Sequence, residues 1–358
     1  MDQYDIANTR LISQQIAGTK FKSAKEIVSW MGAMQSQDLN MAKWAIGIRL
    51  NKVTEKSIDT AINSGEIMRT HLLRPTWHFV SADDIYWMLE LTAPRIKSFM
   101  KSSNKLLELT DKILTKSNLI IEKALSGSKH LTRKELIFEI NKAKIATDNN
   151  RSGHILLNAE MEGIICNGKM NEKQTTYALL NERIKKPKAL HKEESLYKLA
   201  NKYFESHCPA AFLDFVWWSG LSVTDAKHAM QLIKDNFISE KINSREYWFP
   251  NSFSIPKKYK ESLYLLPAFD EFLISYKDRS AAIIQEHQKK TFSNNGIFWP
   301  VIIANGHAVG IWKRELKKDK IIVQANFFEE KNKAAEYLIK KASEKLGYFL
   351  NHKIEIAD

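Results

Sequence analysis

The sequence has little of what cross-links a protein or anchors it in a membrane. Its 358 residues include only two cysteines, Cys166 and Cys208, which form no CxxC pair. Neither a disulfide framework nor a zinc cluster is implied, which fits a reducing compartment. The densest apolar stretch, AAFLDFVWW, is interrupted by Asp214 and is far shorter than the roughly 18 residues of a membrane span. The first residues, MDQYDIANTR, are too polar for a signal peptide. We therefore expect a soluble, cytoplasmic protein.

Catalytic signatures with a fixed spacing are missing as well. The chain contains no Walker loop, no GxSxG elbow and no zinc-binding spacing of histidines and cysteines. The common nucleotide hydrolases, serine hydrolases and zinc enzymes are thereby disfavoured. The composition is 44% hydrophobic and 27% charged, which is ordinary for a globular protein. The length suffices for two to four domains.

Charge is distributed unequally between the two signs. The chain has 54 Lys and Arg residues against 41 Asp and Glu, a formal net charge of +13 and a pI near 9.4. This balance favours an acidic partner, with nucleic acid first and an anionic membrane surface second. A basic protein that binds nothing acidic is the alternative, because net charge alone is unspecific.

The most informative stretch is 33–81. Two segments with helical period, MAKWAIGIRL and SIDTAINSGEI, precede two extended runs, IMRTHLL and TWHFVS, which meet at Arg74-Pro75. Proline presets the backbone of a turn, so the two runs predict a β-hairpin. Helices followed by such a hairpin are typical of a winged helix-turn-helix, in which one helix enters a DNA groove and the wing contacts the duplex. Upstream, SAKEIVSWMGAM predicts a helix with Ile27, Val28, Met31 and Met34 on its apolar face.

An internal repeat indicates a second copy of this module. Ala61–Ile67 and Ala159–Ile165 share the pattern A-x-x-x-G-x-I, and in both a helix leads into a hairpin. The glycine falls where a helix C-terminus requires a left-handed residue. Further along, three helices and an extended pair, FISEKIN and EYWFP, suggest a third winged helix, in which Trp217 and Trp218 are either core residues or stack on bases.

The last part of the chain differs in character. The runs SLYLLPAFDEFLI, IFWPVII, HAVGIWKREL and KIIVQANFF have strand propensity, and a final helix, KNKAAEYLIKKASEKLGY, follows them. We therefore predict an α+β fold that is mainly α, with a C-terminal β-barrel-like domain. The expected domains are three winged helices and this barrel, at residues 1–80, 81–186, 187–255 and 256–358.

Serine and threonine residues predict the starts of several helices. Ser81 with Asp84 is a variant of the capping box, Thr132 with Glu135 is a complete one, and Ser222 precedes a helix in the third module. Pro209 is expected to begin the helix before that.

The expected hairpin carries the first candidate site. Arg69, His71, Arg74, Thr76 and His78 can donate hydrogen bonds to phosphate or minor-groove acceptors of DNA. His71 and His78 lie on the two strands and could share a metal ion, although no third ligand is evident nearby. Plain polarity of an exposed surface is the remaining interpretation.

The segment MQSQD carries the second candidate site. Gln35 and Gln37 follow a helix whose apolar face ends near Met34, so we expect them at a helix end or in a loop. Two carboxamides can position a water molecule or contact a base or sugar, but neither is a strong general base. Asp38 is the adjacent carboxylate. On these residues alone, polar side chains at a helix end are the favoured interpretation.

Motifs along nearly the whole chain resemble one family. In order, they are MQSQD, RTHLLRPTWHFV, GHILLNAEMEGIICNG, TYALLNER, FVWWSGLSVTDAK, LLPAFDEFLISYKDRS and GIWKREL. This combination is similar to that of the AlkZ/YcaQ family of bacterial winged-helix DNA glycosylases. The resemblance implies three tandem winged-helix modules and a β-barrel in a C shape around duplex DNA. It also implies an enzyme without metal or cofactor that hydrolyses the N-glycosidic bond of N7-alkylated purines, in some members at interstrand crosslinks. Tandem modules in one chain do not need dimerisation, so we expect a monomer.

The same resemblance suggests roles for individual residues. Gln35 and Gln37 match the Gln-x-Gln catalytic motif of the AlkZ branch, whereas Ser36 replaces its usual aliphatic middle residue. Asp270 and Glu271 in LPAFDE either face the DNA cleft or form a buried pair with Arg279. The second arrangement is favoured because acids near DNA are electrostatically costly. Two other classes stay open: a DNA-binding regulator without catalysis, and a scaffold whose winged helices bind proteins.

Overall fold

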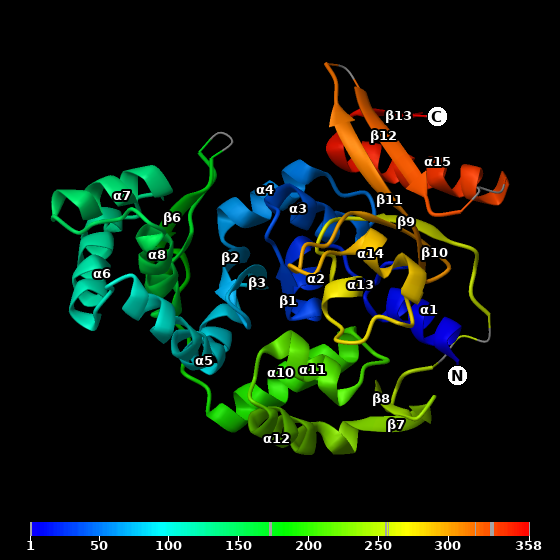
Figure 1. Ribbon diagram of the computed structural model, residues 1–358, viewed down its shortest axis with the longest axis horizontal. Coiled ribbons are helices and arrows are strands. Elements are labelled where there is room, and N and C mark those ends of the chain that lie inside the picture. Colours follow the sequence, from blue (N-terminus) through cyan, green and yellow to red (C-terminus); the bar gives the residue numbers. More distant parts are fainter. Residues whose placement is uncertain are drawn as a thin grey trace. The chain divides into compact units, whose positions relative to one another are not determined.

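The computed structural model describes residues 2–171, 174–254, 256, 258–318, 320–329 and 333–357. Contacts along the chain divide it into two compact units. Unit 1 consists of Met1–Ile58 and Leu196–Asp358, and unit 2 consists of Asp59–Ser195. Helices and strands alternate irregularly in both, so the protein belongs to the α+β class, as predicted (Figure 1).

Unit 2 begins with the predicted helix and hairpin. Helix α4 (Glu55–Ser64), which starts in unit 1, leads into β2 (Ile67–Leu72) and β3 (Thr76–Ser81). The two strands are antiparallel, with His71 opposite Trp77 and Thr70 opposite His78. The hairpin and its turn at Arg74-Pro75 are thereby confirmed.

Both copies of the repeat end their helices in the same way. Gly65 and Gly163 have φ angles of +84° and +66°, a region that is favourable for glycine and strained for other residues. In each copy the amide after the glycine donates to the carbonyl of the alanine that opens the repeat, Ala61 or Ala159, over 3.0 Å. This is the Schellman arrangement, so the expected left-handed C-terminus is confirmed twice.

The rest of unit 2 is a helical layer with a small sheet. Its elements are α5 (Ile85–Leu106), α6 (Asp111–Leu125), β4 (Leu131–Thr132), α7 (Arg133–Lys142), α8 (Arg151–Met161), β5 (Ile165–Asn167), β6 (Thr176–Leu179) and α9 (Leu180–Arg183). The three strands form an antiparallel sheet in the order β4-β6-β5. Its core is built mainly from Leu and Ile side chains of α6, α7 and α8.

The two predicted capping boxes in unit 2 differ in outcome. Thr132 accepts a hydrogen bond from the amide of Glu135, whose carboxylate in turn accepts from the amide of Thr132, as predicted. The prediction at Ser81 is wrong, because Ser81 is the last residue of β3 and helix α5 starts after Asp84. The Ser81 hydroxyl instead donates to the Asp84 carboxylate over 2.6 Å. The same two residue types interact here through their side chains rather than as a helix cap.

The helical part of unit 1 comes from both ends of the chain. Its elements are α1 (Gln3–Ser13), α2 (Ala24–Met31), β1 (Ala33–Gln35), α3 (Leu39–Ile48), α10 (Lys192–Ser206), α11 (Phe212–Ser219), α12 (Val223–Ile233), the 3-10 turn η1 (Lys234–Asn236) and the hairpin β7 (Phe237–Ile242) and β8 (Arg245–Pro250). Ser222 caps α12 as predicted. Pro209 does not begin α11, because Ala210 pairs with Trp248 as an isolated bridge and holds the chain extended there. Trp218 is fully buried, whereas Trp217 is 42% exposed.

The C-terminal part of unit 1 is a curled, half-barrel sheet. Its strands are β9 (Leu263–Leu266), β10 (Val301–Ala304), β11 (His307–Leu316), β12 (Lys320–Phe327) and β13 (Lys353–Ala357), in the order β13-β12-β11-β10-β9. Helix α15 (Lys333–Leu350) packs on β9 and β13. Figure 1 shows α15 and β13 at the orange-red end of the colour scale. Strand β13 was not predicted; it pairs parallel to β12 after the final helix.

Contrary to the prediction from its strand propensity, the run SLYLLPAFDEFLI is not extended throughout. Only β9 is a strand; Asp270 then caps a short helix, α13 (Glu271–Ile274), by accepting from the amide of Phe272 over 2.9 Å. Two further short helices, η2 (Gln285–His287) and α14 (Gln288–Thr291), follow. The indoles of Trp44 and Trp312 each donate to a carbonyl of β9 over 2.7 Å, which fixes the strand that leads to α13.

Candidate active site

The Gln-x-Gln segment lies between two helices of unit 1. Helix α2 ends at Met31, and Gly32 with φ +75° turns the chain into β1. The prediction that the helical face extends to Met34 is therefore wrong, and Gln35 lies on a short strand rather than at a helix end. Asp38 caps α3 by accepting from the amide of Met41 over 3.0 Å.

The residues of this segment differ sharply in exposure. Gln35 is 7% exposed and Ser36 is fully buried, whereas Gln37 and Asp38 are exposed. The hydroxyl of Ser36 thus occupies an interior position, where the family pattern expects an aliphatic side chain. Only Gln37 of the two glutamines presents its side chain broadly to solvent.

A carboxylate from a distant part of the sequence holds Gln35 in place. Glu271, the first residue of α13, accepts a hydrogen bond from the backbone amide of Gln35 over 2.5 Å. Its second oxygen accepts from the hydroxyl of Ser275, one turn further along. Glu271 is 1% exposed, so these bonds form in a low-dielectric interior where they are strong. The conformation of the motif is therefore tied to LPAFDE.

The neighbouring Asp270 is also buried, but its partner is not the predicted one. Arg49, at the end of α3, donates to both carboxylate oxygens of Asp270 over 2.8 Å, and both side chains are at most 1% exposed. The prediction that Asp270 pairs with Arg279 is therefore wrong; Arg279 donates to backbone carbonyls, and its guanidinium lies 4.9 Å from the ring centroid of Phe298. A buried pair was correctly anticipated; the identity of its cation was not.

Arg49 connects Asp270 to other parts of unit 1. Beyond Asp270 it donates to the carbonyl of Ala45 and to the side chain of Gln14, each over 2.8 Å. Gln14 in turn donates to the carbonyl of Glu271 and to the hydroxyl of Tyr276. Neither Arg49 nor Gln14 was singled out from the sequence. The one available signal was a lone arginine closing the apolar helix segment MAKWAIGIRL.

Asp214 is a third buried acid of unit 1. Asp214 accepts from the amides of Ala211 and Lys277 and lies 3.8 Å from the guanidinium of Arg10. Burial raises the pKa of this carboxyl, and the Arg10 charge counteracts the shift. Arg10 also stacks 3.6 Å from the ring centroid of Tyr276. Unit 1 thus contains two buried carboxylates with arginine partners, Asp214 and Asp270. Gln14 links the backbone of Glu271 to Tyr276, on which Arg10 stacks.

The predicted DNA-binding residues lie in unit 2, on two faces of the hairpin. Residues opposite one another share a face and successive residues alternate, so Arg69 and His71 lie on one face and Thr76 and His78 on the other. Because His71 and His78 face opposite ways, the hypothesis of a metal ion shared between them is wrong. Within the described ranges, no group of three or more His, Cys, Asp or Glu residues is arranged to hold a metal.

The face with Arg69 and His71 packs within unit 2. His71 pairs through Nδ1 with the carboxylate of Glu160, which is fully buried. The rings of His71 and Trp77 lie 4.1 Å apart, and the Arg69 guanidinium lies 4.2 Å from the Trp77 centroid. The backbone amide of Arg69 donates to the Asn167 side chain over 2.6 Å. These contacts join the first copy of the repeat to the second.

His78 differs from the other hairpin residues. Its side chain is fully buried, and burial lowers its pKa to about 3, with the nearby Arg74 charge acting in the same direction. The imidazole is therefore neutral at physiological pH, which does not favour a phosphate contact. Arg69, Arg74 and Thr76 keep partial exposure.

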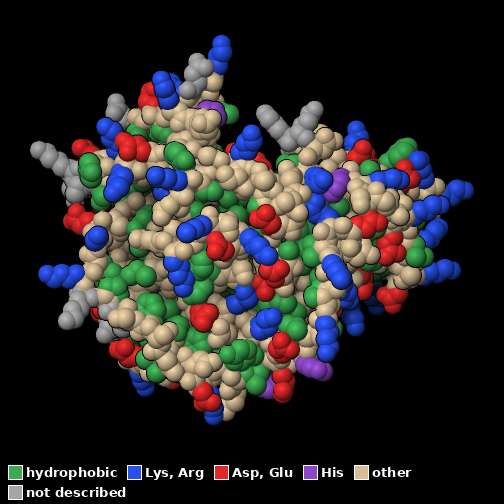
Figure 2. All heavy atoms as spheres, turned by 180° about the vertical axis from the view of Figure 1, so that it is seen from behind, with side chains coloured by type: hydrophobic (Ala, Val, Ile, Leu, Met, Phe, Trp, Pro, Cys, Tyr) green, Lys and Arg blue, Asp and Glu red, His purple; other side chains and the backbone are tan. Residues whose placement is uncertain are grey.

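Charge on the surface is mixed. On the face shown in Figure 2, Lys and Arg side chains are spread among Asp and Glu rather than gathered in one patch. Among the residues that the structure describes, none of the helices combines the length and apolar character that crossing a bilayer requires.

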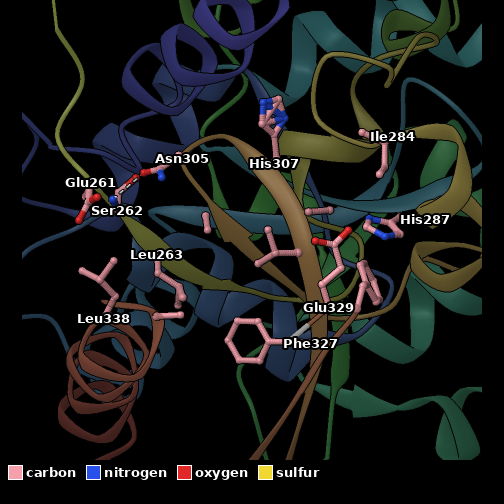
Figure 3. A pocket seen from close by; sticks show the side chains of 15 residues that line it. Glu261, Ser262, Leu263, Ile284, His287, Asn305, His307, Phe327, Glu329 and Leu338 are labelled. Atoms are coloured by element: carbon pink, nitrogen blue, oxygen red, sulfur yellow. Dashed lines mark hydrogen bonds between the residues drawn. The ribbon is translucent and has the colours of Figure 1, made fainter. Parts of the chain in front are cut away.

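Unit 1 also contains a well-formed cavity that is not part of the Gln-x-Gln segment. It has a volume of about 330 Å³ and is lined by residues of the sheet, η2 and α15. Figure 3 shows His287 and Glu329 on one side of it and Leu263 and Leu338 on the other, with Ser262 and Asn305 hydrogen-bonded over 2.9 Å. Neither Gln35 nor Glu271 lines it, so the cavity is separate from the Gln-x-Gln segment.

Comparison with known proteins identifies the family. A family model described as DNA glycosylase AlkZ-like matches residues 28–349. The chain belongs to the AlkZ-like DNA glycosylase family. It is 20% identical over 307 residues to a Streptomyces sahachiroi protein named interstrand DNA cross-link repair glycosylase, with 81% of this chain and 82% of that protein covered.

The solved structures agree on the fold. The structure of the Streptomyces sahachiroi DNA glycosylase AlkZ matches with a TM-score of 0.81 at 17% identity and covers 100% of both chains. As an AlkZ-like glycosylase, the protein is a DNA repair hydrolase that acts on N-glycosyl bonds of DNA.

Proposed function

We propose that this AlkZ-like glycosylase hydrolyses the N-glycosidic bond of N7-alkylated purines in duplex DNA, with Gln35 and Gln37 as the catalytic pair. The observation that carries the proposal is the contrast within the motif. Gln35 is held through its backbone by buried Glu271, while Gln37, two residues on, is exposed to an incoming substrate.

The chemistry suits two carboxamides. Alkylation at N7 places a positive charge on the purine, which makes the base a good leaving group. The enzyme then has to orient a water molecule and stabilise an oxocarbenium-like sugar, which preorganised dipoles can do without a strong base. A carboxamide offers both a carbonyl acceptor and an amide donor for this task. Asp38 is a capping residue beside the pair, and Asp270 and Glu271 support it from within rather than contact DNA.

The proposal extends to crosslinks. The Streptomyces relative is named for interstrand cross-link repair. A crosslinked base is tethered to the opposite strand and cannot readily leave the helix, so ordinary base flipping does not suit it. An exposed Gln37 is compatible with a substrate that stays in the duplex, and we infer that this chain also acts on such lesions.

We further propose that the chain acts as a monomer at the nucleoid, with three winged-helix modules and a barrel-like domain in the segments 1–80, 81–186, 187–255 and 256–358. Arg69, His71, Arg74 and Thr76 would hold the DNA, with buried His78 supporting the hairpin. The net charge of +13 supports this interaction. Because phosphate contacts release counterions, affinity for duplex DNA is expected to fall steeply with salt.

The decisive experiment is base release from duplex DNA carrying 7-methylguanine. Gln35→Ala and Gln37→Ala are each expected to slow single-turnover release by about 100- to 1000-fold, the loss typical of a removed transition-state dipole. Affinity for the duplex stays unchanged. The matched control is Gln231→Ala, which removes an exposed glutamine of α12. If the wild type releases neither 7-methylguanine nor a crosslinked N7 adduct while still binding DNA, the proposed substrate class is wrong.

A further inference from the structure

We propose that Glu271 is a positioning residue of the reaction, which fixes the backbone of Gln35 so that its carboxamide is already oriented before substrate binds. The inference rests on the proposed role of Gln35 and Gln37. It assigns a third residue, far from the motif in sequence, to the same site.

The first observation is the directness of the contact. One carboxylate oxygen of Glu271 accepts from the amide of Gln35 over 2.5 Å, across 236 residues of sequence. Hydrogen bonds to an ionised acceptor are short and about twice as strong as neutral ones. Gln35 is the last residue of β1, where the chain leaves the strand, so this bond sets the direction in which the motif continues.

The second observation is that Glu271 itself has little freedom. Ser275 donates to its other oxygen, and α13 begins at Glu271 because Asp270 caps that helix. Asp270 in turn accepts hydrogen bonds from both terminal nitrogens of Arg49. A carboxylate fixed at both oxygens and at its backbone can transmit a defined geometry to its partner, whereas a mobile one cannot.

The third observation separates the roles of the two adjacent acids. Asp270 is paired with a guanidinium and caps a helix, both of which serve folding. Glu271, in contrast, contacts the motif. Burying an acid is costly unless it has hydrogen-bond partners, and the amide of Gln35 is one of them. A misplacement of about 1 Å at a catalytic group can cost about 100-fold in rate, so a residue that sets the position of Gln35 has a kinetic effect without contacting the substrate.

The test uses the full chain and single-turnover release of 7-methylguanine. Glu271→Ala is expected to lower the rate constant at saturating enzyme by about 100-fold, with the Kd for duplex DNA unchanged. Glu271→Gln keeps an oxygen that can accept from Gln35 and is expected to stay within about tenfold of the wild type, since it loses only the added strength of an ionised acceptor. A rate for Glu271→Gln close to that of the wild type would show that the acceptor oxygen at this position matters for positioning Gln35.

Asp214→Asn is the matched control, because Asp214 is likewise a buried acid of unit 1 that accepts backbone amides. It is expected to lower stability and leave the rate of folded enzyme unchanged. If Glu271→Ala retains the wild-type rate, or if it and Asp214→Asn lose rate equally, the inference is overturned while the glycosylase proposal stands.

A measurement independent of activity keeps the inference separate from the proposed function. The amide proton of Gln35 in a labelled sample is expected downfield in the wild type and shifted upfield in Glu271→Gln. If the Gln35 amide proton has the same chemical shift in the wild type and in Glu271→Gln, the hydrogen bond between the two residues is contradicted, whatever the substrate. If instead the wild type releases no base but the resonance behaves as expected, the proposed function fails and the positioning role in catalysis falls with it, although the contact itself stands.

Discussion

Two buried glutamates hold the two candidate regions of this molecule in different ways. In unit 1, Glu271 accepts a hydrogen bond from the backbone amide of Gln35. In unit 2, Glu160 pairs with the imidazole of His71 and so engages the side chain itself. The first contact fixes the course of a backbone segment. The second fixes the orientation of a side chain within the packing of the hairpin.

The two regions also differ in how they are connected to the rest of their units. The Gln-x-Gln segment contacts Glu271 of α13, and the start of that helix is held by Arg49 and Asp270, which are 221 residues apart in sequence. The hairpin depends on its neighbouring repeat copy through Glu160 and Asn167, 89 and 98 residues from their partners. The support of the Gln-x-Gln segment includes one buried ion pair, so a single substitution at Arg49 is expected to weaken it more than one substitution weakens a hairpin that several ring and amide contacts hold.

Replacing Arg49 is expected to have the largest effect. Arg49→Met leaves the Asp270 carboxylate buried without its guanidinium, which costs about 3–5 kcal/mol of the free energy of unfolding. Urea denaturation followed by circular dichroism measures the loss. The double variant Arg49→Met/Asp270→Leu should recover much of it, because no lone charge then remains. Equal stability of Arg49→Met and the wild type would contradict the buried pair.

Acid is expected to weaken both units through buried histidines. Burial lowers the pKa of His207 in unit 1 and of His78 in unit 2 to about 3, from the ordinary 6.5. Each group therefore binds a proton more readily in the unfolded chain, so its contribution is fully present above pH 6.5 and is lost progressively toward pH 3. At about pH 5 the loss amounts to about 2 kcal/mol for each histidine.

Urea titrations between about pH 7 and pH 5 measure this effect by difference. The free energy of unfolding of the wild type should fall more steeply with acid than that of His207→Gln or His78→Gln. The difference in slope against pH should correspond to the uptake of about one proton on unfolding for each histidine. Parallel pH profiles for the wild type and both variants would show that these imidazoles do not resist protonation. A difference for only one variant would show that the two units bury their histidines unequally.

The smallest expected effect tests the repeat. Gly163→Ala places a side chain at φ +66° where no heavy atom lies within 4 Å of the added carbon, so the cost is backbone strain alone, about 1–2 kcal/mol. Gly65→Ala meets the Arg183 side chain at 3.5 Å at φ +84° and is expected to cost at least as much. Thermal denaturation compares them, with Gly163→Asn as a milder control because Asn tolerates this region better. An unchanged midpoint in Gly163→Ala would contradict the left-handed helix end.

Local signals predicted much of the fold because they act over a few residues. The hairpin around Arg74-Pro75, the caps at Thr132 and Ser222 and the two glycine helix ends each depend on chemistry within one turn of chain. Errors arose where the same residue types had a second local use. Ser81 and Asp84 interact without capping, Gly32 ends α2 before Met34, and Asp270 starts a helix inside an apparently extended run.

The sequence by itself determined the family, the Gln-x-Gln motif and the expectation that Asp270 and Glu271 are buried rather than exposed. Only the tertiary structure decided which partners they have: Arg49 instead of Arg279 for Asp270, and the backbone of Gln35 for Glu271. The physical reason is that charge and burial preferences specify that a carboxylate needs a donor, but not which one. Packing of α3, β1 and α13 brings a particular arginine and a particular amide within reach across more than 200 residues, and no periodicity or cap signal along the chain encodes that choice.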